Sequence, residues 1–143
     1  MIVDVDSEWF WWPIRVYYED TDAGGIVYNA NYLRFFERAR TEWLRGAGID
    51  HGELADAGLQ LVLSRADIRF VAPARLDDEL RAGVKVTRVR RASLDLEQRA
   101  LHLDGQHLCT AFVQVACVAT EGLRPRPFPL SLRESLGQSP QLP

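Results

Sequence analysis

The sequence contains only two cysteines, Cys109 and Cys117, and they lie eight residues apart in one predicted strand. Eight strand residues span roughly 27 Å, whereas the Cα atoms of two bridged cysteines lie within about 7 Å of each other. A disulfide between them is therefore not expected, which excludes a disulfide-stapled scaffold. The expected state is two buried free thiols in a reducing cytoplasm.

Long hydrophobic runs are also missing. The sequence has no stretch of about 18 apolar residues, so no membrane-spanning helix is expected. Near the N-terminus Asp4, Asp6 and Glu8 interrupt the apolar residues, which argues against a secretory signal peptide. These absences predict a cytoplasmic protein without stable insertion into a membrane.

Positive charge is not in excess, because 17 Lys and Arg residues stand against 20 Asp and Glu residues, a formal net charge of -3. A general nucleic-acid-binding surface is basic, so nucleic acid is not an expected partner. A local basic site for a small anionic ligand remains compatible with this balance. The length of 143 residues predicts a single domain over residues 1–143 and excludes a (β/α)₈ barrel, which needs roughly 250 residues.

Hydrophobic residues repeat with two different periods along the chain. Residues 9–18 are aromatic and β-branched, and they predict a strand that starts after Pro13 or lies at an edge of the sheet. Apolar residues at three- and four-residue spacing then predict a long helix over 30–47, capped by Asn29 or Asn31, and a short helix over 50–57. Alternating apolar residues predict four further strands, over 61–71, 80–89, 93–103 and 108–119.

These elements predict an α+β fold. Because the connections between the last four strands are short, these strands are expected to form an antiparallel meander. The wide apolar face of the long helix needs a sheet to cover it. The simplest packing is one long central helix wrapped by a curved antiparallel sheet of about five strands. The core is expected over about 9–129, followed by an irregular tail over about 121–143 with a weak helix near 130–136.

The densest polar cluster, Glu19 to Asp22, stands directly before a pair of glycines, between the first strand and the long helix. An EF-hand loop starting at Asp20 is excluded, because its fifth and twelfth positions would be a glycine and an asparagine. A phosphatase-type Asp-x-Asp site would need magnesium ligands from elsewhere and a larger fold. A capped acidic loop is the plain alternative.

The cluster also combines a carboxylate with the start of a helix. The first backbone N–H groups of a helix have no partner within it and carry partial positive charge, so they can polarise a carbonyl oxygen or hold an oxyanion. Asp22, beside them, is placed to attack the carbonyl carbon or to activate water. Together these groups are the minimal parts for acyl transfer.

Two segments of the chain resemble a known enzyme family. Residues 12–45 (WPIRVYYEDTDAGGIVYNANYLRFFERARTEWLR) and 72–78 (APARLDD) are similar to the YbgC-type acyl-CoA thioesterases, which are associated with the Tol-Pal genes. These enzymes belong to the 4-hydroxybenzoyl-CoA thioesterase branch of the hot-dog superfamily, and the resemblance continues weakly to about Pro129. It implies a hot-dog fold, a dimer or homotetramer, no metal and no cofactor. The implied reaction is hydrolysis of an acyl-CoA, or of an acyl carrier protein thioester, to a free carboxylic acid.

The resemblance also implies roles within the loop. Asp22 matches the catalytic carboxylate, as general base or nucleophile, and backbone N–H groups near Tyr28 and Asn29 match the donors that polarise the thioester carbonyl. Many members carry a histidine where this sequence has Asn29, so a histidine-assisted step is not implied; the Asn29 side chain is expected to orient water or Asp22. The neighbouring Asp20 is expected to matter less for turnover. The rival prediction is a non-catalytic acyl-CoA-binding or scaffolding module on the same fold.

A second cluster, at the end of a predicted strand, consists of Arg88, Arg90, Arg91 and Ser93. Three arginines at one strand end are suited to bind the phosphates of coenzyme A. The resemblance favours this role, since hot-dog enzymes bind the nucleotide near this region, and a solvated hairpin is the alternative. The histidines are His51, His102 and His107, and none of them falls on the long helix or its leading loop. A hot-dog dehydratase needs a histidine base at its active site, so this activity is not expected.

Overall fold

The computed structural model describes residues 2–3 and 8–137. Every element predicted from hydrophobic periodicity is present, close to its expected bounds. In chain order the elements are β1 (Ile2–Val3), β2 (Phe10–Arg15), a 3₁₀ turn (Tyr18–Asp20), α1 (Asn31–Gly46), α2 (His51–Asp56), β3 (Leu59–Phe70), β4 (Glu79–Val89), β5 (Ser93–His102), β6 (His107–Ala119) and α3 (Leu130–Gly137).

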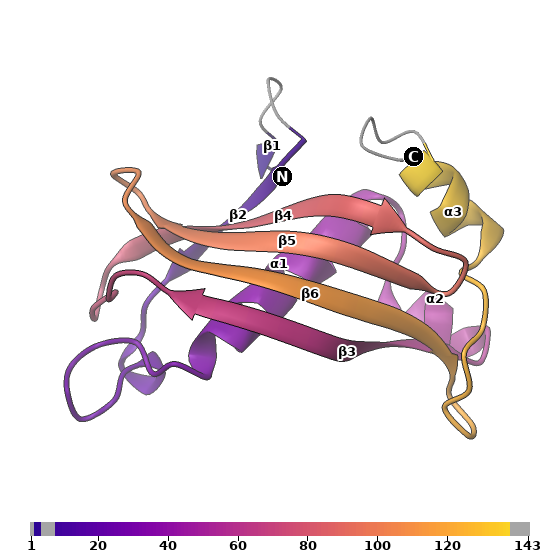
Figure 1. Ribbon diagram of the computed structural model, residues 1–143, viewed down its shortest axis with the longest axis horizontal. Coiled ribbons are helices and arrows are strands. Elements are labelled where there is room, and N and C mark those ends of the chain that lie inside the picture. Colours follow the sequence, from indigo (N-terminus) through magenta and orange to yellow (C-terminus); the bar gives the residue numbers. More distant parts are fainter. Residues whose placement is uncertain (1, 4–7, 138–143) are drawn as a thin grey trace.

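The strands form one antiparallel sheet in the order β1-β2-β4-β5-β6-β3. The helix α1 lies across one face of this sheet and packs against β2, β4 and β5 (Figure 1). The predicted architecture of a long central helix wrapped by an antiparallel sheet is confirmed, with the two-residue β1 as an additional strand. Among the described residues, β1 pairs with Phe10 and Trp11 alone, so β2 is an edge at Pro13, where proline is tolerated.

The predicted meander of the last four strands is wrong in one connection. The strands β4, β5 and β6 do follow one another as a meander, but β3 pairs with β6 at the far edge and not with β4. Both sides of β4 are already occupied, by β2 and β5. The segment 71–78 therefore crosses the end of the sheet, where Ala74 O accepts a hydrogen bond from Val27 N at 2.8 Å. This crossing ties the segment to the loop in front of α1.

The apolar face of α1 forms the centre of the core. Phe35, Phe36 and Ala39 are fully buried. On the outer face of the sheet, the ring of Trp11 packs against β4 at Gly83. A Cβ atom at position 83 would lie 2.5 Å from that ring, so only glycine permits this approach.

The C-terminal part of the chain completes the core. The two cysteines on β6 are buried free thiols, and burial raises the pKa of Cys109 to about 12. The helix α3 is present where a weak helix was predicted, and it buries Leu132 and Leu136 beside Phe128. The rest of the predicted tail, residues 138–143, lies outside the described residues.

The strand β3 is the open edge of the sheet. It pairs with β6 on one side, and no strand of the described chain pairs with its other side. At and just beyond this strand, the residues Leu63, Phe70 and Val71 are 41%, 55% and 62% exposed. A long unpaired edge that carries apolar side chains is a surface on which another chain can pair.

Candidate active site

The polar cluster in front of α1 forms a small hairpin. Thr21 pairs with Val27 across it, and Asp22 N donates to Ile26 O at 2.9 Å. At the turn Gly25 has a φ of +79°, a left-handed backbone conformation that glycine adopts without steric cost. The hydrogen bonds and this glycine give the loop a defined shape, so its side chains hold fixed positions relative to α1.

Asp20 holds this hairpin from inside. It is 2% exposed, and its Oδ2 accepts a hydrogen bond from Tyr17 N while its Oδ1 accepts one from Asn31 Nδ2, both at 2.8 Å. Its backbone oxygen accepts from Tyr28 N at 2.9 Å. One aspartate thus joins the chain after β2, the first residue of α1 and the segment between hairpin and helix. Its role is to support the loop.

Asp22 has the opposite environment. It is exposed, and its Oδ1 accepts a hydrogen bond from Gly24 N at 2.8 Å. Its Oδ2 receives no hydrogen bond from the described residues. A main-chain N–H therefore orients this carboxylate while one oxygen remains open to a ligand or water. The structure distinguishes the two aspartates of the Asp-Thr-Asp segment, which composition alone does not.

The first turn of α1 has no side-chain cap. Its N-cap is Ala30, and the predicted asparagine cap is wrong, because Asn31 donates to Asp20 instead and Asn29 is exposed. Tyr28 N is already bonded to Asp20 O, whereas Asn29 N and Ala30 N have no acceptor within the described residues. Of the two predicted oxyanion positions, only Asn29 therefore offers an open N–H, at the positive end of the helix.

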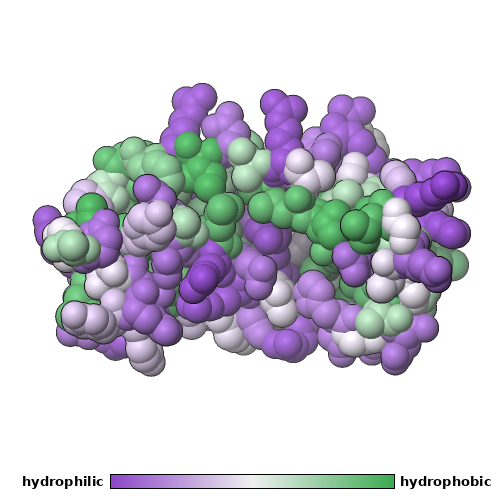
Figure 2. All heavy atoms as spheres, turned by 90° about the horizontal axis from the view of Figure 1, so that it is seen from below, coloured by the Kyte–Doolittle hydropathy of each residue, from purple (hydrophilic) through white to green (hydrophobic). Residues whose placement is uncertain are grey.

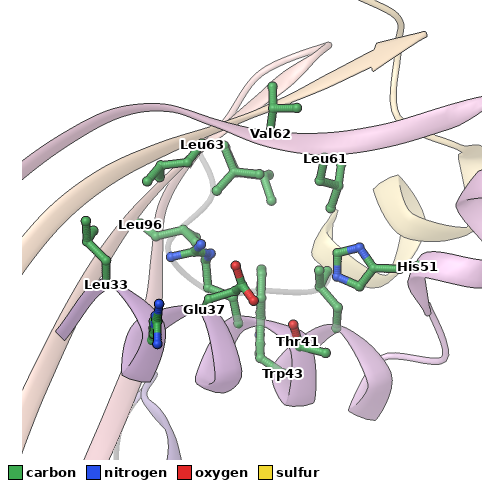
Figure 3. Close-up of a pocket in the computed structure, with 14 residues that line it drawn as sticks. Leu33, Glu37, Thr41, Trp43, His51, Leu61, Val62, Leu63 and Leu96 are labelled. Carbon is green, nitrogen blue, oxygen red and sulfur yellow. The ribbon is translucent and has the colours of Figure 1, made fainter. Parts of the chain in front are cut away.

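A cavity of about 490 Å³ opens between α1 and β3 and begins at the first turn of α1. Figure 3 shows Glu37 and Thr41 extending from α1 into this space, with Leu61 and Leu63 of β3 across it. Small-molecule sites typically occupy about 300–1,000 Å³ and are mostly apolar. The strand side of the cavity is apolar throughout, lined by Leu61, Val62, Leu63, Leu94, Leu96 and Val115.

The sequence analysis missed two polar residues: Arg40, which lines the cavity, and Gln98, which is hydrogen-bonded to it. Gln98 is fully buried; its Nε2 donates to Phe36 O at 3.0 Å, and its Oε1 accepts from an Arg40 guanidinium nitrogen at 2.9 Å. Burial lowers the pKa of Arg40, and the nearby Glu37 raises it. The sequence could have drawn attention to Gln98, because it occupies an inward-facing position of β5 where an apolar residue is expected. Arg40 gave no such signal.

The predicted phosphate-binding residues surround the turn between β4 and β5 but differ in their environments. Arg90 donates to Asp95 Oδ1 at 2.5 Å, and this contact holds the pKa of Asp95 below its usual range. Ser93 O accepts from Arg90 N at 2.8 Å and closes the turn between β4 and β5. Arg88 and Arg91 are exposed. The turn thus presents two exposed arginines and one that is paired.

These arginines also lie far from Asp22 within one chain. The hairpin of Asp22 adjoins the segment just before β4, since Ile26 pairs with Arg75, whereas the arginines lie at and beyond the other end of β4 (Figure 1). At roughly 3.3 Å per residue, this 11-residue strand separates its two ends by about 33 Å. A single chain does not bring the two predicted groups of residues together.

None of the three histidines is part of α1 or of the hairpin that leads to it. His51 lines the far end of the cavity, and His102 Nε2 lies 3.7 Å from Asp78 Oδ1. Among residues 2–3 and 8–137, no group of three or more His, Cys, Asp or Glu side chains is arranged to hold a metal ion. No helix in this part of the chain is long and apolar enough to cross a membrane.

The fold and the loop together define a class of protein. A central helix wrapped by an antiparallel sheet, with an exposed aspartate in the loop that leads to the helix, is the arrangement implied by the hot-dog resemblance. The sequence model of the thioesterase-like superfamily matches residues 16–136. The chain therefore belongs to this family.

Within the family, the chain is similar to YbgC proteins. It is 43% identical to the acyl-CoA thioester hydrolase YbgC of Escherichia coli, over 86% of this chain and 92% of that protein. It is 42% identical to the acyl-CoA thioesterase YbgC of Haemophilus influenzae, over 87% of this chain and 91% of that protein. A crystal structure of a probable thioesterase from Bartonella henselae is 37% identical and superposes with a TM-score of 0.80, covering 85% of this chain and 99% of that one. The resemblance to YbgC-type thioesterases is confirmed.

Proposed function

We propose that this protein hydrolyses acyl-CoA thioesters to a carboxylic acid and coenzyme A, the activity for which its YbgC relatives are named. One observation carries the proposal: the exposed carboxylate of Asp22 and the open N–H groups of Asn29 and Ala30 lie in one ordered loop at the start of α1. Asp20 fixes this loop, so the carboxylate and the donors keep their relative positions without substrate.

The donors act on the thioester carbonyl. Its oxygen accepts a hydrogen bond from Asn29 N, and the negative charge that develops on this oxygen lies at the positive end of α1. These interactions therefore stabilise the transition state more than the bound substrate. The exposed Asn29 side chain lies beside this point and orients the attacking water or Asp22.

Asp22 promotes attack on the thioester carbonyl carbon in one of two ways. As a general base, it takes a proton from water while the water oxygen attacks the carbonyl carbon; the C–S bond then breaks and the thiolate of coenzyme A receives the proton. As a nucleophile, its Oδ2 attacks the carbonyl carbon, the C–S bond breaks and the thiolate of coenzyme A leaves; water then attacks the Asp22 carbonyl carbon of the resulting anhydride, releases the acid and supplies the proton that the thiolate takes up. A single turnover in heavy-oxygen water distinguishes the routes, because the label enters the product acid in the first and Asp22 in the second.

The acyl group is proposed to occupy the cavity between α1 and β3. This cavity starts at Leu33, in the first turn of α1, and its strand side is apolar. A volume of about 490 Å³ accommodates a small or medium acyl group. The thioester of a carrier protein presents the same reacting bond at the same place, so it remains a second candidate substrate.

The coenzyme A phosphates are proposed to bind a second copy of the chain. Within one chain, Arg88 and Arg91 lie at the end of β4 that is remote from Asp22. In a dimer with a two-fold axis beside β3, the strands of the second copy run in the opposite direction. The β4–β5 turn of that copy then lies on the side where the first chain has Asp22. We therefore propose a homo-oligomer built on such a dimer, with Arg88 and Arg91 contributed across the interface and Arg90 retained by Asp95.

Replacing Asp22 with asparagine tests the proposal. The asparagine side chain keeps an oxygen that can accept from Gly24 N, so the loop is expected to stay folded. Without a base or carboxylate nucleophile, kcat for thiol release from acyl-CoA is expected to fall at least about 10²-fold. The matched control is Glu19→Gln, which removes an exposed charge from the same segment and is expected to keep near-normal turnover.

The rival binding or scaffolding role makes a different prediction. Under that role the wild-type protein binds acyl-CoA saturably but releases no thiol from a panel of short, long and aromatic acyl-CoAs. A folded Asp22→Asn variant with wild-type kcat would reject the catalytic assignment. Isothermal titration with a non-hydrolysable acyl-CoA ether measures binding independently of turnover.

A further inference from the structure

A row of polar side chains crosses the outer face of the sheet, on the side away from α1. Arg65 of β3, Gln114 of β6, Asp95 of β5 and Arg88 of β4 are successive Cα partners across the four strands. Directly paired residues of neighbouring strands point to the same face of a sheet, so these four side chains lie together. Figure 2 shows hydrophilic side chains projecting from this face, which is its upper side and faces the viewer in Figure 1.

Two β-bulges anchor the row. The pairing register of β3 shifts at Ser64, and that of β4 shifts at Thr87. Each bulged residue donates its hydroxyl to a main-chain oxygen of the next strand: Ser64 Oγ to Gln114 O, and Thr87 Oγ1 to Asp95 O, both at 3.1 Å. A bulge re-aims the side chains beside it. Both bulges are thus attached to the two central members of the row, Gln114 and Asp95.

The carboxylate of Asp95 is the centre of the row. Its Oδ1 accepts from an Arg90 guanidinium nitrogen at 2.5 Å and from Gln114 Nε2 at 3.3 Å, and Gln114 Oε1 in turn accepts from Ser64 Oγ at 3.0 Å. The hydrogen bond from Arg90 holds the pKa of Asp95 below its usual range, and Gln114 and Arg88 act in the same direction. Asp95 is therefore a fixed negative charge beside the β4–β5 turn.

This negative charge opposes the arginines of the turn. Arg90 is held by Asp95, and Arg88 is the Cα partner of Asp95 on β4. Arg91 is the one arginine of the turn for which no contact with this carboxylate is seen among the described residues. A phosphate group that approaches the turn therefore meets a weaker attraction than three free arginines would exert.

The ion pair is open to an approaching anion. A cavity of about 300 Å³ on the outer face has Arg90 and Asp95 in its wall, together with the exposed ring of Phe112. The side chains of Arg90 and Asp95 keep 37% and 29% of their surface exposed. Asp95 thus acts directly on the electrostatic field that a small anion meets at the turn.

We propose that Asp95 limits the affinity of the β4–β5 turn for the phosphates of coenzyme A, by retaining Arg90 and by opposing Arg88. This inference rests on the proposed function, in which the turn binds those phosphates. Free coenzyme A carries the same phosphates as the substrate, so a turn that binds them tightly also retains the product. Binding energy that substrate and transition state share does not raise kcat. Asp95 is a positioning residue in this arrangement, because it acts through the arginines.

Replacing Asp95 with asparagine tests this role by a gain of affinity. The asparagine keeps an oxygen that can accept from Gln114 Nε2, so the row is expected to stay folded; Asp95→Ser is the second variant if it does not. With Arg90 released, the dissociation constant of coenzyme A in isothermal titration is expected to fall about 10-fold, the scale of one hydrogen bond to a charged group. Inhibition of turnover by coenzyme A is expected to strengthen equally, whereas KM for a pantetheine thioester stays unchanged.

Two further variants separate this effect from a general change of charge. Glu97→Gln is the matched control, because Glu97 lies on the same face of β5 and also holds an arginine, Arg99. Arg99 lies over the ring of Trp9, four residues further along the strand, so its release is expected to change coenzyme A affinity less than about 2-fold at about 0.15 M salt. The double variant Asp95→Asn/Arg90→Ala restores the net charge of the turn and is expected to return to within about 2-fold of wild-type affinity.

Four outcomes would overturn the proposal. They are unchanged or weaker coenzyme A binding by the folded position-95 variant, an equal gain in Glu97→Gln, a gain that the double variant keeps, and absence of coenzyme A binding by both the wild type and the position-95 variant. Binding is measured without turnover, so the two proposals can fail separately. A protein that shows the gain but releases no thiol would contradict hydrolysis alone, and an active enzyme without the gain would contradict the role of Asp95 alone.

Discussion

Replacing Asn31 with aspartate is expected to destabilise the loop that carries Asp22, and this effect is expected to disappear when Asp20 becomes asparagine. In the native chain, Asn31 Nδ2 donates to Asp20 Oδ1 at 2.8 Å, and both residues are buried, 8% and 2% exposed. The Asn31→Asp variant puts two carboxylate oxygens at this distance. In the double variant the asparagine and aspartate have exchanged places, and the hydrogen bond re-forms in the opposite direction.

The magnitude follows from the contact distance. Two unit charges 2.8 Å apart repel by about 6 kcal/mol at an effective dielectric constant of about 20. Holding a proton on one carboxyl is the cheaper alternative, because a pKa near 4 makes this cost about 4 kcal/mol at pH 7. We therefore expect Asn31→Asp to lose about 4 kcal/mol of folding stability at pH 7. Asp20→Asn alone is expected to lose only about 1 kcal/mol, since the Asn31 amide can turn to accept from the asparagine introduced at position 20.

The sign of the pH dependence identifies the cause. The folded Asn31→Asp variant binds one proton more than its unfolded state near pH 7, so its stability is expected to rise by about 1.4 kcal/mol for each unit that the pH falls, until about pH 4. The double variant lacks this dependence, since its single carboxylate accepts from the neighbouring amide. Urea unfolding at constant protomer concentration, from pH 7 down to pH 5, measures the stability of the single and the double variant at each pH.

A control variant shows whether the loss of stability comes from the added charge itself or from placing that charge in a buried site. Asn29→Asp adds the same charge at the exposed start of α1, where the helix dipole favours it, and is expected to leave stability within about 0.5 kcal/mol of the wild type. Equal stability of Asn31→Asp and wild type at pH 7 would contradict the assigned hydrogen bond. So would failure of the double variant to recover within about 1 kcal/mol of the wild type.

Three further outcomes are expected. Replacing Arg88 and Arg91 with alanine should raise KM for acyl-CoA but not for the corresponding pantetheine thioester, which lacks the nucleotide; equal changes in steady-state kinetics would assign the arginines elsewhere. Gly83→Ala should destabilise the fold by about 1–3 kcal/mol in urea unfolding, because the new Cβ displaces the buried Trp11 ring. The thiol of Cys109, with its pKa raised to about 12, should react with a thiolate-specific reagent near pH 8 only after the protein is unfolded. Rapid labelling of the folded protein would contradict its burial.

The elements of the fold could be predicted because each has one dominant period. The strands β4 to β6 alternate apolar and polar residues, and α1 repeats its apolar residues at helical spacing. The position of β3 could not be predicted from the same signal, because alternation marks a strand but not its neighbour. It was decided by tertiary contacts: β2 occupies the side of β4 that a continuous meander would have used.

The sequence could indicate the candidate site only in part, because local patterns again do not show which residues contact one another in the fold. The cluster before α1 is visible as composition, and the resemblance to YbgC-type enzymes placed the chemistry on Asp22. Local sequence did not reveal that Asp20 is buried against Asn31, nor that Asn31 is therefore unavailable as a helix cap. The arginines lie near one another in sequence, but their distance from Asp22 depends on the length and direction of β4.

The helix α1 links the packing of this protein to its proposed catalysis and assembly. The open N–H groups of Asn29 and Ala30 lie at the start of α1, in the same loop as the exposed Asp22. The face toward β2, β4 and β5 is buried and fixes the helix on the sheet, while the face toward β3 carries Glu37 and Arg40. Because these faces belong to one rigid element, a displacement of α1 at the proposed interface also moves the donors at its start. Loss of the second copy is therefore expected to lower turnover even with a pantetheine substrate, which does not need the arginines of that copy.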